Sequence, residues 1–378
     1  MKILHLADTH LGYSAYRKTT EEGVNQREMD VYDAFTRCID YAVASKPDLV
    51  LHAGDLFDSV RPTNRAITVA LQQILRLSKE HIPCVLISGN HETPKLKETG
   101  NIFRIFEHLD SVYPIHNNHY ETVVVKSKKE TVRIHALPQC QNSKEFDLNC
   151  KKITLDKKAD FNILLAHGAV TGIKEFRMNE FNELFIPVKT LSTDFDYIAL
   201  GHYHTYTKLQ ENAFYAGSTE HFSFTEADDQ KGLLEVTLGR SVKHRFIPVQ
   251  TRVMVDTAPI DCAALTIEQI TRKIKEGVQS VEPTGKILRL RLINIPAHIQ
   301  RGIDFHQLQN LGKTAVYFEI KSIPIKSEGT SFDEGYTMKS LADEYEKFLS
   351  AQELPEKEIL LKLGLHYINS IEEQDDVT

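Results

Sequence analysis

Short apolar runs and longer amphipathic stretches alternate over the first 90 residues of the chain. The apolar runs predict strands. The amphipathic stretches, whose apolar residues recur at three- and four-residue steps, predict helices. The expected order is βαβαβ, with elements at residues 3–7, 27–44, 49–53, 64–79 and 84–88. Right-handed crossovers make such strands parallel, so their C-terminal ends should meet at one edge of the sheet.

The same pattern continues for another 160 residues and then changes. Further strand candidates, which predict a second and partly antiparallel sheet, lie at 132–137, 161–166, 197–200, 213–216, 233–238 and 244–249. Beyond residue 250, strands at 252–256, 286–293 and 315–320 alternate with helices at 266–278 and 304–311, which indicates a small α+β domain. A Gly- and Ser-containing linker and two short helices around Pro355 follow. The expected domains are 1–250, 251–325, a linker at 326–336, and 337–378.

Composition is that of a soluble globular protein: 378 residues, 41% hydrophobic and 26% charged, enough for two domains. The five cysteines are widely spaced and form no CxxC pair, which argues against a disulfide framework and against a thiolate metal site. No stretch resembles a signal peptide or a membrane span, so a reducing cytoplasm is expected. The net charge of −7 means that any affinity for nucleic acid must be local.

Potential metal ligands stand directly after five of the predicted strands. They are Asp8 and His10, then Asp55, Asn90 with His91, His167, and finally His202 with His204. Ligands of open α/β sheets bind in the crevice outside the strand C-termini, so these donors should converge there. Gly54 and Gly89 beside them permit close backbone turns. Nitrogen and oxygen donors without thiolate suit Mn, Fe or Zn, and two ions bridged by Asp55 could hydrolyse a phosphoester.

Five motifs, present in order, resemble those of the calcineurin-like metallophosphoesterases. They are Asp8-Thr9-His10, Gly54-Asp55-Leu56-Phe57-Asp58, Gly89-Asn90-His91-Glu92, His167-Gly168 and Gly201-His202-Tyr203-His204. The extended form Ala7-Asp8-Thr9-His10-Leu11-Gly12, followed by Arg27-Glu28, is similar to the SbcD-type repair nucleases of bacteria and archaea. The resemblance covers about residues 1–250. It implies an α/β fold, a four-layer αββα sandwich, with a small α+β capping domain and a C-terminal helical hairpin.

The resemblance also implies roles for the site residues. Asp8, His10, Asp55 and His204 would hold one ion, and Asp55, Asn90, His167 and His202 the other. His91 would be catalytic, stabilising the transition state or protonating the leaving oxygen. Many family members have a second histidine where this chain has Asp58, which puts a second catalytic histidine in doubt. His5 and His52 lie inside apolar strands and are interpreted as core residues.

The function that the resemblance implies is a DNA nuclease of double-strand-break repair with two Mn²⁺ per subunit, while Mg²⁺, Fe²⁺ and Zn²⁺ stay open. It would be a cytoplasmic, nucleoid-associated homodimer with double-strand exonuclease and single-strand endonuclease activity. The terminal helices would bind an SMC-like ABC ATPase. Expected DNA contacts are Tyr13, Arg17, Arg61, Lys95, Lys174 and Arg177. The expected dimer interface contains Leu71, Phe103 and Phe106, with Ile105 or Phe106 on an outer face.

Two alternatives stay open at this stage. One is a phosphatase or a small-molecule or nucleotide phosphodiesterase on the same metal site. Protein serine/threonine phosphatases of the superfamily carry Arg after the second Asp of their Gly-Asp-x-x-Asp motif, and Ser59 stands there in this chain. The other is a non-catalytic scaffold, but scaffolds of this kind lose metal ligands, and this chain keeps all seven donors.

Overall fold

A computed structural model describes residues 1–127, 130–171, 183–192 and 194–324, together with 345–346, 349, 357, 359–365 and 367. The chain divides into two compact units, Met1–Pro324 and Ile325–Thr378. The predicted linker at 326–336 and most of the predicted hairpin at 337–378 lie outside the described residues. Within these described ranges, no helix is long and apolar enough to cross a bilayer.

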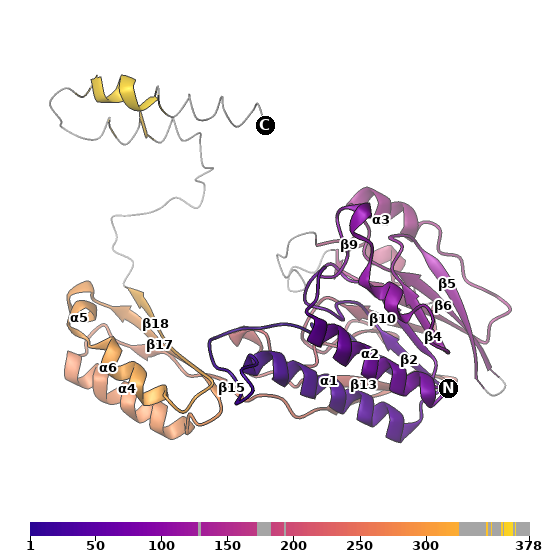
Figure 1. Ribbon diagram of the computed structural model, residues 1–378, viewed down its shortest axis with the longest axis horizontal. Coiled ribbons are helices and arrows are strands. Elements are labelled where there is room, and N and C mark those ends of the chain that lie inside the picture. Colours follow the sequence, from indigo (N-terminus) through magenta and orange to yellow (C-terminus); the bar gives the residue numbers. More distant parts are fainter. Residues whose placement is uncertain are drawn as a thin grey trace. The chain divides into compact units, whose positions relative to one another are not determined.

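The first sheet has six strands in the order β14-β13-β1-β2-β3-β4, and β1 to β4 are parallel. Its strands are β1 Lys2–Leu6, β2 Leu49–His52, β3 Cys84–Ile87, β4 Val112–Ile115, β13 Gly232–Thr237 and β14 Lys243–Pro248. Helices α1 Gln26–Ser45 and α2 Asn64–Lys79 lie side by side over one face (Figure 1). The βαβαβ prediction is therefore confirmed. The last two strand candidates do not belong to the second sheet, because β13 pairs antiparallel with β1.

The second sheet also has six strands, in the order β11-β12-β10-β7-β6-β5, and is partly antiparallel as predicted. Its strands are β5 Glu121–Ser127, β6 Glu130–Leu137, β7 Phe161–His167, β10 Tyr197–Gly201, β11 Thr207–Lys208 and β12 Ala213–Tyr215. Helix α3 Ser143–Cys150 packs on its outer face through Phe146. A separate two-stranded pair, β8 Ala169–Val170 and β9 Phe185–Ile186, lies beyond β7.

Alternation along the strands explains why the two sheets stack. In β1, Ile3 belongs to the core between the sheets, while Leu4 and Leu6 belong to the core under α1 and α2. In β2, Leu51 faces the other sheet and Val50 faces the helices. A strand buried on both faces is apolar throughout, as these runs are. The result is the four-layer αββα sandwich that the resemblance implied.

A third sheet follows with a core of its own. Its four parallel strands are β15 Met254–Asp256, β16 Ile260–Asp261, β17 Ile287–Ile295 and β18 Tyr317–Pro324. Its helices are α4 Ile267–Val281, α5 Ala297–Gly302 and α6 Phe305–Gln309. Ile270, Ile274 and Val278 recur at four-residue steps on α4, and they are buried in one cluster with Leu288 and Leu290 of β17. This is the small α+β unit that the sequence predicts.

Of the two residues expected on an outer face, Ile105 or Phe106, Phe106 is buried and Ile105 is partly exposed. Residues 102–106 form a 3-10 helix, η2 Ile102–Phe106, which has three residues per turn and so places Phe103 and Phe106 on the same side. Both rings are fully buried beside Phe57. Neither can contact a second copy. Leu71 and Ile105 are only partly buried and are still available for the proposed dimer.

A buried ion-pair network joins α1 to the start of the third sheet. Arg27 is almost fully buried and donates to Asp30 Oδ2 at 2.7 Å, with Glu220 Oε1 3.5 Å away. Arg252 donates to the same Asp30 oxygen through Nε at 3.0 Å and, through its backbone N–H, to Glu220 at 3.0 Å. The two carboxylates thus offset the burial of two guanidinium groups, which would be costly alone.

Asp30→Asn should lower the free energy of unfolding by about 3 kcal/mol, because it leaves the buried Arg27 guanidinium and the half-buried Arg252 guanidinium without that carboxylate. Burial raises the pKa of Asp30, but Arg252 and Arg27 outweigh it and hold the pKa below its ordinary value. A depressed carboxyl pKa stabilises the fold above the unfolded value of about 3.9, and this contribution is lost as the pH falls through the folded pKa. The difference between wild type and variant should therefore shrink from pH 7 towards pH 3.

Urea unfolding at each pH measures this difference. Asp33→Asn, on the same helix but exposed, is the matched control and should change stability by less than about 0.5 kcal/mol. Equal midpoints for wild type and Asp30→Asn at pH 7 would show that the network contributes nothing to stability.

Candidate metal centre

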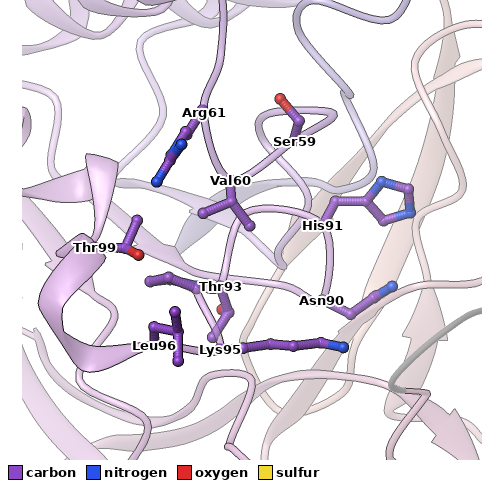
Figure 2. Close-up of a pocket in the computed structure, with 10 residues that line it drawn as sticks. Ser59, Val60, Arg61, Asn90, His91, Thr93, Lys95, Leu96 and Thr99 are labelled. Carbon is purple, nitrogen blue, oxygen red and sulfur yellow. The ribbon is translucent and has the colours of Figure 1, made fainter. Parts of the chain in front are cut away.

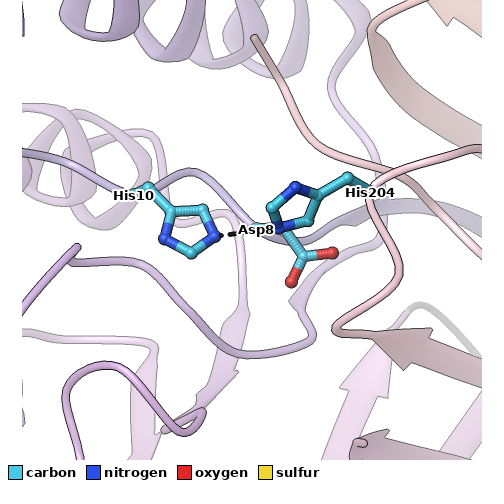
Figure 3. A group of neighbouring side chains, drawn as sticks. All are labelled: Asp8, His10 and His204. Carbon is cyan, nitrogen blue, oxygen red and sulfur yellow. Dashed lines mark hydrogen bonds between the residues drawn. The ribbon is translucent and has the colours of Figure 1, made fainter. Parts of the chain in front are cut away.

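The donors predicted from the sequence meet at the C-terminal edges of the two stacked sheets. Asp8 and His10 follow β1, and Asp55 follows β2; His167 ends β7, and His202 follows β10. Their donor atoms, within 4.8 Å of one another in each group, form the clusters Asp8/His10/His204, Asp55/His167/His202 and His10/Asp55/His91. Figure 3 shows the first cluster, in which His10 and His204 face each other.

Short distances connect these clusters into one centre. His10 Nε2 lies 3.2 Å from His204 Nε2 and 3.9 Å from Asp55 Oδ2. His167 Nε2 lies 3.2 Å from Asp55 Oδ2 and 2.9 Å from Asn90 Oδ1. Asp55 therefore stands between the two groups, which is the position that the bridging role requires.

The backbone around the donors adopts conformations that side chains rarely tolerate. Asp8, His10 and Asp55 have φ values of 51°, 51° and 53°, and His202 has 102°. Such left-handed residues cost about 1–3 kcal/mol each and cluster at functional sites. Gly54 has φ of 93°, and a Cβ there would overlap the His167 ring. A Cβ at Gly89 would overlap Asp55, so both glycines allow the close approach that the sequence predicts.

Charges in the centre depend on one another because all the groups are buried. Burial disfavours the charged forms, but His167 and the neighbouring imidazoles hold the pKa of Asp55 well below its ordinary value. For His167, burial is outweighed by the Asp55 carboxylate, which raises the pKa of the imidazole to about 9. Burial raises the pKa of Asp8, because nearby histidines offset it only in part.

The donor set fits divalent metal ions. Among the described residues, buried Asp8 Oδ2 has no hydrogen-bond partner, and buried Asp55 Oδ2 has the His167 imidazole beside it, at 3.2 Å. Buried carboxylate oxygens are normally paired or bound to a metal. His167 Nδ1 donates to Ala53 O at 2.8 Å, which fixes the tautomer and leaves Nε2 on the side of Asp55.

Asp58 lies beside two histidines of the centre, where many relatives have a histidine of their own. Its Oδ1 is 3.3 Å from His10 Nδ1 and 3.8 Å from His91 Nδ1. Its backbone carbonyl accepts a hydrogen bond from His91 Nδ1 at 3.1 Å. A carboxylate behind a metal-binding histidine orients the ring and strengthens it as a ligand. If His10 binds a metal ion, Asp58 would have this positioning role.

Three glutamates contact residues of the centre, and none of them was predicted from the sequence to have a role there. Glu92, fully buried, accepts the Gly89 N–H at 2.9 Å and so holds the loop that carries Asn90. Glu183 Oε1 is 2.9 Å from His202 Nε2. Glu226 Oε1 is 3.3 Å from His204 Nδ1 and Glu226 also accepts from Lys231 at 2.7 Å. Only Glu92 belongs to a motif; Glu183 and Glu226 stand outside all five, so no sequence signal marked them.

The predicted DNA contacts are placed as follows. Tyr13 is half-buried and donates to Phe222 O at 3.2 Å, next to the ring that packs on His10 and His204. Arg17, Arg61 and Lys95 are exposed. Lys174 and Arg177 lie outside the described residues. His5 and His52 are buried core residues as predicted, and burial lowers the pKa of each to about 3.

Comparison with known proteins agrees with this geometry. Residues 1–206 match the family model of the calcineurin-like phosphoesterases. A protein of Methanococcus maripaludis named DNA double-strand break repair protein Mre11 is 33% identical over 241 residues, which are 61% of this chain and 60% of that protein. Proteins of the same name from Sulfolobus acidocaldarius and Saccharolobus solfataricus are 28% and 31% identical, over 74% and 56% of this chain. The matched segments span 72% and 51% of those two proteins.

Proposed function

The chain belongs to the calcineurin-like phosphoesterase family, and from this membership we propose that it is a manganese-dependent DNA nuclease of double-strand-break repair. The observation that carries the proposal is the convergence of seven donors and His91 at the C-terminal edges of the two stacked sheets. The relatives named DNA double-strand break repair protein Mre11 support DNA as the substrate. Duplex ends would be cut by exonuclease activity and single strands by endonuclease activity, in the cytoplasm and on the nucleoid.

Two Mn²⁺ ions would be held at this centre. Asp8, His10, Asp55 and His204 would hold one ion, and Asp55, Asn90, His167 and His202 the other. When bound, the ions would polarise the phosphodiester and lower the pKa of water enough for it to attack phosphorus. Gly54 and Gly89 leave room for the donors to approach one another, and Glu92 holds the loop that carries Asn90.

His91 would act on the scissile phosphate rather than on a metal. Its Nδ1 donates to the carbonyl of Asp58, which fixes the ring and leaves Nε2 to carry the proton that is exchanged. Its backbone N–H donates to Asp55 Oδ1 at 3.0 Å, so the ring is tied to the proposed bridging carboxylate. From this position His91 would stabilise the charge on the phosphate or protonate the leaving oxygen.

The remaining parts of the chain would serve DNA entry and assembly. The sheet of β15 to β18 would cap the site and limit how DNA enters, and a homodimer would hold two DNA ends. The described residues of the second unit include four exposed apolar side chains: Ile359, Leu360, Leu363 and Tyr367. Contiguous apolar surface of this kind indicates a partner, and the proposed one is an SMC-like ABC ATPase.

The proposal is tested with a labelled linear duplex and a labelled single strand, each incubated with Mn²⁺, Mg²⁺ or EDTA. Wild type should release nucleotides with Mn²⁺ and none with EDTA. His91→Ala should be slower by on the order of 10²-fold, because it removes a positioned proton donor, and elemental analysis should show unchanged metal content. His298→Ala, an exposed histidine on α5, is the control. Hydrolysis of bis-p-nitrophenyl phosphate without cleavage of either DNA would reject the nuclease and leave a small-molecule phosphodiesterase.

A further inference from the structure

A cavity of about 770 Å³ opens directly beside the metal centre. Asn90 and His91 form one side of it, and the other walls come from the segments 59–61 and 93–99. Figure 2 shows Val60, Arg61 and Leu96 around this cavity, with His91 and Asn90 at its edge. The cavity therefore shares two residues with the centre that would bind the scissile phosphate.

The chemistry of this cavity differs from that of the centre. Val60, Pro94 and Leu96 line it with apolar surface, and Leu96 is 67% exposed. A phosphate or a sugar would gain little from such a surface. A flat ring with apolar faces would cover it, because burying apolar area is favourable by about 25 cal/mol per Å². The volume is also within the range of roughly 300–1,000 Å³ typical of small-ligand sites.

Charges and hydroxyl groups around the cavity narrow the ligand class. Arg61 and Lys95 contribute positive charge to its lining. These positive charges would attract phosphate groups attached to the ligand on either side. The Thr99 side chain adds a hydroxyl group that can meet a polar ring edge, whereas the buried Thr93 hydroxyl donates to Gly89 O at 2.7 Å. A ring with apolar faces and a polar edge, attached to phosphates, describes a nucleobase.

We propose that this cavity binds one unpaired nucleobase of the nucleotide next to the scissile phosphate. This inference rests on the proposed nuclease function and specifies its substrate. A base inside a duplex is stacked and paired, so it must leave the helix to enter, at a cost of a few kcal/mol that is smallest for a single strand. Cleavage of a duplex would then require local opening at the site, and single strands would be cut without that step.

Leu96→Asp tests the proposal, with Leu148→Asp as the matched control. Leu148 is 51% exposed on α3 and does not line the cavity. The substrates are single-stranded oligonucleotides with one cleavable linkage and phosphorothioates elsewhere, in which each base beside that linkage is replaced in turn by an abasic residue. For wild type, kcat/KM should fall about tenfold at one abasic position, which corresponds to about 1.4 kcal/mol. On the unmodified strand, Leu96→Asp should have a kcat/KM about tenfold below that of wild type. Its kcat/KM should fall no further on the abasic strand.

Other outcomes overturn the proposal. If the abasic penalty is the same in wild type and Leu96→Asp, the base does not occupy this cavity. If Leu96→Asp instead halves the mass in light scattering and keeps the abasic penalty, a second copy of the chain covers the cavity. The control Leu148→Asp must have the same metal content and the same cleavage rate as wild type.

A binding measurement separates this inference from the nuclease proposal. An oligonucleotide with 2-aminopurine at the same position is titrated with protein in EDTA, where no cleavage occurs. Its fluorescence should rise when the base leaves the stack for a cavity lined by Val60, Pro94 and Leu96. If wild type cuts no DNA with any metal, the nuclease proposal fails. The cavity proposal fails if the fluorescence change is absent, or if it persists in Leu96→Asp.

Discussion

Asp55→Asn is expected to lower the rate of DNA hydrolysis by on the order of 10⁴-fold, since bound metal supplies several kcal/mol of transition-state stabilisation. Asp55 lies close to both groups of ligands, 3.9 Å from His10 and 3.2 Å from His167. An amide is a much weaker bridge than a carboxylate. Mn²⁺ should therefore raise the melting temperature of wild type but leave that of the variant unchanged.

Nuclease rates and thermal unfolding with and without Mn²⁺ measure both effects. Asp110→Asn, an exposed position after η2, serves as the control for the loss of one negative charge. A variant that keeps half the wild-type rate and its full metal-dependent stabilisation would exclude Asp55 as the bridging ligand.

Gly54→Ala is expected to reduce activity by on the order of 10³-fold and stability by about 4 kcal/mol. The added Cβ would overlap His167, and the left-handed backbone adds strain of about 1 kcal/mol, while forcing a packed core apart costs roughly 1–3 kcal/mol. His167 cannot move away easily, because Ala53 O accepts its Nδ1 proton. A displacement of about 1 Å in a catalytic group can cost 10²-fold or more.

Gly23→Ala separates strain from overlap. Gly23 also has positive φ, 76°, but a Cβ there would meet nothing within 4 Å. This control should lose about 1 kcal/mol and no activity. If both variants behave alike, the overlap with His167 has no consequence, and the glycine is needed only for its backbone conformation.

The sequence predicted the positions of the donors well because the rule that places them is topological. Parallel strands of one sheet bring their ends together, so Asp8 and Asp55 could be grouped before any distance was known. His167 ends β7 of the second sheet, and the stacking of the two sheets brings it to the same place. The grouping of these side chains is what the structure describes. Which of them hold which ion is still a proposal, and so is the identity of the metal.

Features that depend on side-chain packing could not be predicted. The family resemblance implied a dimer interface with Phe103 and Phe106 and with Ile105 or Phe106 on an outer face, whereas a 3-10 turn directs both phenylalanines inward. Glu183 and Glu226 contact His202 and His204 from segments that carry no motif. The return of β13 to the edge of β1 joins residues more than 220 positions apart, and local pattern contains no information on that pairing.

The left-handed backbone at Asp8, His10, Asp55 and His202 has an evolutionary consequence. At each of these positions glycine would relieve the backbone, so the chain would gain stability by losing a donor. Selection for heat resistance alone would therefore replace the donors of the centre by glycine, one residue at a time. Variants obtained by screening for a higher melting temperature should therefore be sequenced at these four codons first, because a gain in stability there means the loss of a metal donor.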